Sequence, residues 1–221
     1  MASDSVDSLH IFDCDGILLD SNKAKLEALR EVLISVGAPI TFVNWAAEEF
    51  RTNFGRTRKQ HFDVFMRYEC NEGFRLSSEK SRQAIQSYGE RVELLYEKCA
   101  VIPETLSFIL GLPADAKIFV VSASDESELR NILPSKIAVL KKQNIFGGPS
   151  SKIKNINKVI EIVGAKNAIF YGDAVQDARA SMDSGVKFLG LSKYSADPSY
   201  FELFCSENNL DCVSSFSEVV C

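Results

Sequence analysis

The sequence lacks several features that would assign the chain to particular classes of protein. No apolar run approaches the roughly 20 residues that a helix needs to span a bilayer. The N-terminal stretch "MASDSVDSLH" has neither the basic start nor the apolar segment of a signal peptide. The net charge is −5, so there is no basic excess that would favour nucleic acid or an anionic membrane surface. We therefore expect a cytoplasmic protein, with neither nucleic acid nor membrane among its partners.

The six cysteines have no metal-binding spacing, and no CxxC pair occurs among them. Because the sequence has no export signal, we expect reduced thiols and no disulfides. Cys14 lies between Asp13 and Asp15, whose negative charges would raise the pKa of the thiol and disfavour the reactive thiolate. We interpret Cys14 as a packing residue. The chain also lacks internal repeats and coiled-coil heptads, and its oligomeric state stays open.

Strand and helix patterns alternate at the two ends of the chain, whose 221 residues suffice for one core with a smaller insert. Short apolar runs predict strands at 8–13, 117–122, 167–172 and 186–191, with a weaker one at 136–140. Helices are predicted at 126–133, 151–164 and 176–185. This alternation favours an α/β fold, a Rossmann-like parallel sheet with helices on both faces.

Residues 22–99 break the alternation. They contain about four helical stretches, and the first of these has an apolar stripe that includes Leu29 and Leu33. No convincing strand occurs between them. We predict an inserted all-helical cap domain at 22–99, with a catalytic core formed by 1–21 and 100–221.

The stretch "HIFDCDGILLDS" places two carboxylates, Asp13 and Asp15, where the first predicted strand ends. Alternation points residues 13 and 15 to the same side of an extended backbone, at the sheet edge where such folds bind ligands. Two carboxylates this close need a cation, a shared proton or full solvation. A solvated Asp-Gly turn is the simpler explanation of this motif taken alone.

Three further segments add to the motif. "FYGDAVQDARAS" ends another predicted strand and supplies Asp173 and Asp177, so that an all-oxygen site of the kind Mg²⁺ prefers becomes possible. "IFVVSAS" ends in Ser122 before a predicted helix start, which suits phosphate oxygens. "GGPSSKIK" places Lys152 at the start of another helix.

Taken in order, these motifs resemble the haloacid dehalogenase superfamily, in the group with a helical cap inserted after the first motif. Asp13 to Ser21 resemble its DxDGxLxDS opening, and Gly172, Asp173 and Asp177 its GDxxxD motif. Ser122 and Lys152 correspond to the motifs between them. Lys154 lies two residues from Lys152, so the assignment of the motif lysine stays open.

The resemblance implies a phosphoric monoester hydrolase. It implies that Asp13 is the nucleophile and Asp15 the general acid and base. It implies a Mg²⁺ ion held by Asp13, Asp15 (through its backbone carbonyl), Asp173 and Asp177. The residues that it implies for phosphate binding are Gly16, Ser122, Ala123 and Lys152. We expect a Mg²⁺-dependent phosphatase that acts on a small phosphorylated metabolite, such as a sugar or sugar-acid phosphate, through an aspartyl-phosphate.

Two other functions stay open at this point. A sugar phosphomutase would use the same residues, and a catalytically idle binding domain is the alternative outside enzymes. Within the cap, Gly55-x-x-Arg58 resembles a turn whose arginine contacts substrate, and an arginine suits a second phosphate or a carboxylate. An exposed basic helix start is the alternative for Arg58. We interpret Trp45 and the several phenylalanines of the cap as helix packing and not as a platform for substrate.

Overall fold

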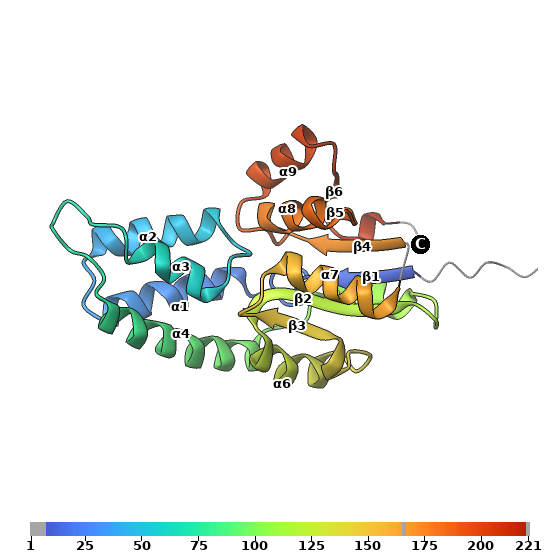
Figure 1. Cartoon of the computed structure of the whole chain (residues 1–221), viewed down its shortest axis with the longest axis horizontal. Coiled ribbons are helices and arrows are strands. Elements are labelled where there is room, and N and C mark those ends of the chain that lie inside the picture. Colours follow the sequence, from blue (N-terminus) through green and yellow to red (C-terminus); the bar gives the residue numbers. More distant parts are fainter. Residues whose placement is uncertain (1–7, 165–166, 220–221) are drawn as a thin grey trace, which may run out of the picture.

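The computed structural model describes residues 8–164 and 167–219. Residues 1–7, which contribute to the expected absence of a signal peptide, lie outside this range, as does Cys221. Figure 1 shows a sheet flanked by helices on one side of the molecule and a group of helices, α1 to α4, on the other. Both parts of the predicted fold class are therefore confirmed.

The sheet has six strands in the order β3-β2-β1-β4-β5-β6, and all of the pairings are parallel. The strands are β1 (Ser8–Phe12), β2 (Lys117–Asp125), β3 (Ile145–Gly148), β4 (Asn167–Gly172), β5 (Lys187–Leu191) and β6 (Asp211–Val213). Strands β1 and β4 lie side by side, with Phe12 opposite Tyr171. The chain segments that follow these two strands therefore leave the sheet at the same edge.

Side chains alternate between the two faces of the sheet, as the period of a strand requires. Leu9 and Ile11 pack in the core under α7 (Lys152–Val163), α8 (Val175–Ser184) and α9 (Pro198–Glu207). Phe12 packs on the opposite face, with Phe108 of α5 (Pro103–Gly111) and Leu133 of α6 (Glu126–Lys136). Short 3₁₀ turns occupy Lys142–Asn144 and Phe216–Glu218.

One strand prediction is wrong. Residues 136–140 form the end of α6 and the turn after it, and the strand at this edge of the sheet is β3. Ile137 and Leu140 are buried in the core, which explains why the run is apolar. An apolar run reports burial and does not by itself distinguish a strand from a buried turn.

The segment predicted to be helical consists of α1 (Asn22–Ser35), α2 (Ile40–Thr52), α3 (Arg58–Phe65) and α4 (Ser78–Lys98). Thr57 and Ser77 cap α3 and α4 with their side-chain oxygens. Trp45 stacks on Tyr68 with ring centroids 3.6 Å apart, so its interpretation as a packing residue is confirmed. The described residues of this segment contain only an isolated bridge between Glu69 and Arg75, and no strand.

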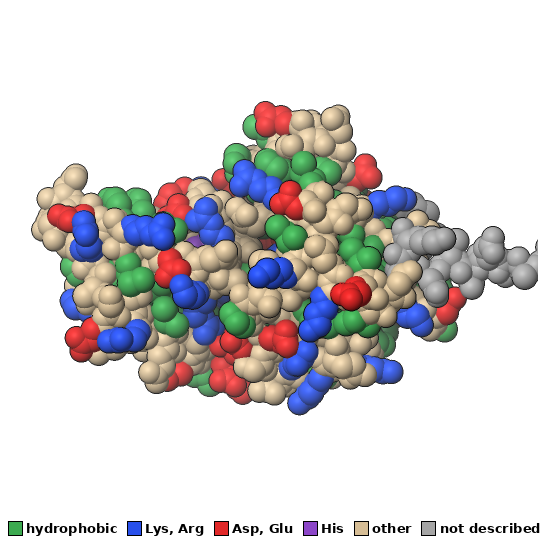
Figure 2. Space-filling model, in the orientation of Figure 1, with side chains coloured by type: hydrophobic (Ala, Val, Ile, Leu, Met, Phe, Trp, Pro, Cys, Tyr) green, Lys and Arg blue, Asp and Glu red, His purple; other side chains and the backbone are tan. Residues whose placement is uncertain are grey.

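The surface and the thiols add little to the functional argument. On the face shown in Figure 2, Lys and Arg side chains are interspersed with Asp and Glu over both parts of the molecule. Within 8–164 and 167–219, none of the helices has the length and apolarity needed to cross a bilayer. The five described cysteines are free thiols. Burial, together with Asp15 and Asp13, raises the pKa of Cys14 well above its usual value, as expected for an unreactive thiol.

Candidate active site

The loop after β1 carries the first pair of carboxylates. The Asp13 N–H donates to the carbonyl of Tyr171 at 2.9 Å, which continues the β1–β4 ladder to the edge of the sheet. Gly16 has φ +76°, and a Cβ there would lie 2.2 Å from Oδ2 of Asp173. Only glycine fits this turn. Because the Gly16 N–H donates to the carbonyl of Leu19 at 2.8 Å, its contact with phosphate stays a prediction.

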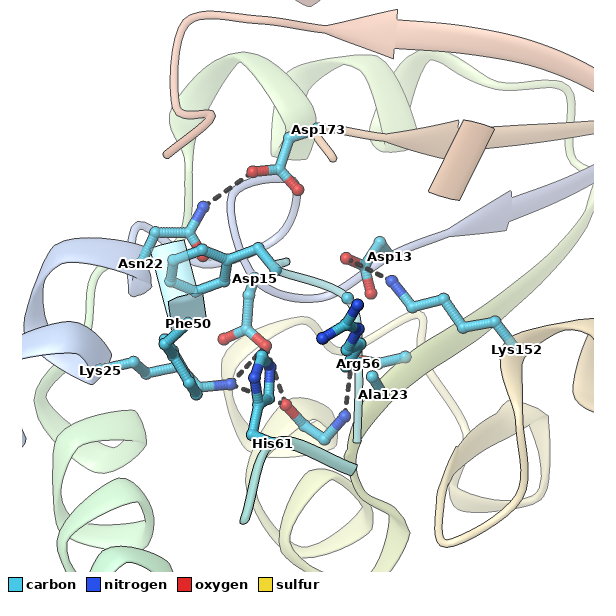
Figure 3. A pocket seen from close by; sticks show the side chains of 14 residues that line it. Asp13, Asp15, Asn22, Lys25, Phe50, Arg56, His61, Ala123, Lys152 and Asp173 are labelled. Carbon is cyan, nitrogen blue, oxygen red and sulfur yellow. Dashed lines mark hydrogen bonds and ion pairs between the residues drawn. The ribbon is translucent and has the colours of Figure 1, made fainter. Parts of the chain in front are cut away.

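Asp13, Asp173 and Asp177 form a buried cluster in which one oxygen of each carboxylate lies within 4.8 Å of the others. Lys152 enters this cluster from the first turn of α7. Its Nζ lies 3.0 Å from Oδ2 of Asp13 and also pairs with Asp177. Figure 3 shows Lys152 reaching Asp13 from the side opposite the helical segment. Among the described residues, Lys152 is therefore the one lysine or arginine that pairs with this cluster of three carboxylates.

The electrostatics of this cluster favour an added cation. Burial, with Asp177 and Asp13, raises the pKa of Asp173 well above its usual value. Burial and Asp13 raise the pKa of Asp177 to about 7, against the opposing effect of Lys152. The Asp13 Oδ1 atom is buried and has no hydrogen-bond partner among the described residues. The donor set is all oxygen, which is what Mg²⁺ prefers, so these residues fit a divalent metal ion.

Asp15 has a different environment. Its carboxylate accepts hydrogen bonds from Lys25 (2.8 Å), Ser124 (2.8 Å), Tyr96 (2.9 Å) and Ser21 (2.6 Å). It does not belong to the carboxylate cluster, so a metal contact from Asp15 would use the predicted backbone carbonyl. Burial raises the pKa of Asp15, but Lys25 and the hydrogen bonds outweigh it and lower the pKa below its usual value.

The sequence argument missed this network around Asp15. Lys25 is buried, and it joins Asp15 to Tyr96 of α4 and Ser124 of β2. Burial lowers the pKa of Lys25, but Asp15 outweighs this effect and raises it. One signal was present in the sequence, because Ser21, which precedes α1, and Lys25 in its first turn are four residues apart and so lie on the same side of this helix start.

The predicted phosphate-binding residues gather at the same edge of the sheet. Ser122, Ala123 and Lys152 line a cavity together with Asp13 and Asp15. Lys154 is exposed on α7 and does not line it. Of the two lysines that the sequence left open, Lys152 is therefore the one that lies in the site.

Arg58 lies in the wall of a neighbouring cavity, at the start of α3. One of its terminal nitrogens, Nη2, donates to both oxygens of Glu128 in α6, at 2.8 and 2.9 Å. The guanidinium also lies over the ring of Tyr88, 5.4 Å from its centroid. Arg58 thus joins the helical segment to the core, and its contact with substrate stays a prediction.

The helical segment supplies further residues that the sequence argument missed. Phe50, Phe54, Arg56 and His61 line the cavity above Asp13 and Asp15, and Figure 3 shows Arg56 and His61 beside these carboxylates. Burial, with Arg56 and Lys25, lowers the pKa of His61 to about 3, so its imidazole is neutral at pH 7. The sequence placed no functional residue here except Arg58.

Residues 10–191 match the model of one protein family, the haloacid dehalogenase-like hydrolases. The chain belongs to this family. The recognition of the superfamily and the expectation of a hydrolase are therefore confirmed. No curated protein matches the sequence.

Solved structures share the fold of this haloacid dehalogenase-like hydrolase at low sequence identity. A predicted phosphatase from Clostridium acetobutylicum is 18% identical, with a TM-score of 0.74 and 97% of each chain covered. CbbY from Rhodobacter sphaeroides, in complex with phosphate, is 15% identical, with a TM-score of 0.72 over 97% of this chain and 96% of that one. A hydrolase from Pseudomonas syringae is 17% identical, with a TM-score of 0.70 and 90% of each chain covered.

Proposed function

We propose that this hydrolase is a Mg²⁺-dependent phosphatase acting on a small phosphorylated metabolite of the sugar or sugar-acid phosphate class. In this proposal residues 1–21 and 100–221 form the catalytic core. Residues 22–99 form a cap that excludes water and selects the substrate. The observation that carries the proposal is the meeting of the Asp13 carboxylate with Lys152, Asp173 and Asp177 at one edge of the sheet.

The reaction divides one displacement into two easier ones. An oxygen of Asp13 forms a bond to phosphorus while the bond from phosphorus to the alcohol oxygen breaks, and Asp15 gives the leaving alcohol its proton. Water then attacks the aspartyl-phosphate, Asp15 takes a proton from that water, and inorganic phosphate leaves. Asp15 returns to its protonated form and Asp13 is regenerated.

Lys25 affects the two steps differently. Its ion pair with Asp15 favours the ionised carboxylate, which is the form that activates water in the second step. Proton donation in the first step draws on the minor protonated form. Substrates with good leaving groups need less of this donation and should react faster in the first step.

The other site residues bind and orient the phosphoryl group. Lys152, Ser122, Ala123 and Gly16 would contact its oxygens, with Lys152 offsetting their charge. Asp13, Asp173, Asp177 and the carbonyl of Asp15 would hold the metal ion. When bound, Mg²⁺ supplies positive charge that lets an anionic nucleophile approach an anionic phosphate.

Release of inorganic phosphate from a panel of phosphate monoesters, with Mg²⁺ and with excess chelator, tests the proposal. We expect turnover with Mg²⁺ and at least roughly a hundredfold loss in chelator that added Mg²⁺ reverses. Turnover unchanged in chelator would contradict the metal site. Release of an isomeric sugar phosphate in place of inorganic phosphate would indicate the mutase. No turnover across the panel would favour the idle domain.

A further inference from the structure

A second cavity opens beside the candidate active site. It has a volume of about 430 Å³ and lies between the helical segment and the ends of β2 and β3. It shares Lys25, Phe50, Arg56 and His61 with the cavity that holds Asp13 and Asp15. Its size is that of a pocket for a small organic molecule. If the phosphate group of a substrate lies beside Asp13, the rest of that substrate would therefore lie in this second cavity.

The cations around this second cavity already have carboxylate partners. Among the described residues that line it, Lys25 pairs with Asp15 and Arg56 with Glu49, Arg58 pairs with Glu128 and Lys59 with Asp63. Asp125, whose carboxylate caps α6, adds a negative charge to the wall. An anionic group on the substrate would compete with these partners for the same cations, and burial makes displacement of the partner costly at Lys25 and Arg58.

Polar groups without partners point to a different kind of ligand. His61 Nδ1, Tyr88 Oη and Arg58 Nε are buried atoms on residues that line the cavity, and none has a hydrogen-bond partner within the described ranges. Tyr88 and His61 are each 2% exposed. Burial raises the pKa of Tyr88 to about 12 and lowers that of His61 to about 3, so both are neutral at pH 7. A buried polar group without a partner costs free energy, which a ligand hydroxyl would recover.

The rest of the wall is apolar. Phe50 and Ile85 contribute hydrocarbon surface beside these polar groups. A ring or chain that carries hydroxyl groups along one edge and C–H groups on its face matches both parts of the wall. A second phosphate or a carboxylate does not match the apolar part of the wall, and it would lie among cations that already have carboxylate partners.

Resting on the proposed phosphatase function, we propose that this cavity binds the neutral, polyhydroxylated body of a sugar or polyol phosphate. His61, Tyr88 and the Nε–H of Arg58 are its hydrogen-bonding partners. The same cavity disfavours substrates that carry a second anionic group. The proposal narrows the substrate class to phosphate monoesters of sugars or polyols that carry no second anionic group.

Binding to the Asp13→Asn chain tests the inference without turnover. Calorimetry would compare three neutral bodies (glycerol phosphate, a pentose phosphate and a hexose phosphate) with three that carry a second anion (phosphoglycolate, phosphoglycerate and a sugar bisphosphate). Inorganic phosphate is the reference. We expect the best neutral ligand to bind at least roughly tenfold more tightly than inorganic phosphate, and more tightly than any ligand of the second group.

Tyr88→Phe adds a sharper comparison, because it removes a single oxygen. It should weaken the best neutral ligand about fivefold and leave the affinity for inorganic phosphate unchanged. Ser81→Ala is the matched control, since it removes another buried hydroxyl that has no described partner, on the same helix but away from the cavity. Ser81→Ala should change neither affinity.

Two outcomes would overturn the inference. One is tighter binding by a ligand with a second anion, and the other is an equal effect of Tyr88→Phe on inorganic phosphate. The Asp13→Asn chain could show the expected binding pattern while the wild-type chain hydrolyses none of these esters. That result would contradict the proposed function and leave the cavity assignment standing. Rapid hydrolysis of phosphoglycolate, with no hydrolysis of the other esters, would contradict the cavity assignment and leave the proposed phosphatase activity standing.

Discussion

Two carboxylates of one loop, Asp13 and Asp15, have opposite environments although they lie two residues apart. Asp13 shares the ammonium group of Lys152 with Asp177 and lies in one carboxylate cluster with Asp173, and its Oδ1 atom has no partner in the described structure. Asp15 accepts hydrogen bonds from four side chains, and one of these is the ammonium group of Lys25. The first site has an excess of negative charge, and the second is neutralised.

This difference arises from the partner elements and not from the loop. The residues around Asp13 come from the position after β4, from α7 and from α8, which belong to the sheet and its helices. Two of the four partners of Asp15, Lys25 and Tyr96, come from α1 and α4 of the helical segment, and Lys25 is the only cation among the four. A cation is therefore needed at Asp13, whereas the helical segment itself stabilises the charge on Asp15.

The largest expected effect concerns Lys152. Lys152→Ala removes the only lysine or arginine that pairs with Asp13 in the described structure, along with the charge that would bind the phosphoryl group. We expect phosphate release with Mg²⁺ present to fall by about a thousandfold. Lys154→Ala, on the exposed side of the same helix, is the control and should retain normal turnover. Equal loss in both variants would show that the charge of α7, and not Lys152, matters.

A smaller effect is expected at the neutralised site. Lys25→Met leaves the buried carboxylate of Asp15 without its cation, so the free energy of unfolding at pH 8 should fall by about 3 kcal/mol. Denaturant titration measures this change. Lys23→Met on the exposed side of α1 is the control, with an expected change below about 0.5 kcal/mol. If Lys25→Met is equally mild, Asp15 does not depend on the helical segment for its charge.

The smallest effect is a pH dependence at His61. The folded pKa is about 3 and the unfolded value about 6.5, so protonation favours the unfolded chain and stability falls as the pH drops below about 6.5. Between pH 7 and pH 5 we expect a loss of about 2 kcal/mol from this group. His61→Gln should lack that part of the loss in denaturant titrations at the two pH values. Identical pH profiles would place the imidazole in contact with solvent.

The sequence predicts the strands and the site around Asp13, because both follow from short apolar runs and from motifs at their ends. Strands β1, β2, β4 and β5 are apolar runs. Asp13 and Asp173 directly follow β1 and β4, and Ser122 lies near the carboxyl end of β2, so the first site follows from the order of the motifs. Strand β3 was missed because it is short and ends in two glycines. A Cβ at Gly147 would lie 2.5 Å from the Ser124 carbonyl, a constraint set by packing that no periodicity reveals.

The second site could not be predicted because its partners are distant in the sequence. Lys25 lies in a helical stretch where a lysine is usually solvated, and Tyr96 stands 71 residues further along the chain. Both lie beside Asp15 only after α1 and α4 pack together. The sequence likewise places Arg58 only at a basic helix start. Its partner Glu128 is 70 residues away in the chain and becomes visible only in the folded structure.

Mass spectrometry of the intact Asp15→Asn chain, after incubation with Mg²⁺ and an aryl phosphate, tests the central claim most directly. The aryloxide leaves without a proton donor because it is a stable anion, whereas hydrolysis of the aspartyl-phosphate requires the missing base. We predict a species about 80 Da heavier that peptide mapping assigns to Asp13, as transfer of one phosphoryl group requires. The Asp13→Asn chain should show neither the added mass nor turnover, with both variants checked for folding by circular dichroism. A label that maps to another residue, or normal turnover in Asp13→Asn, would contradict the account.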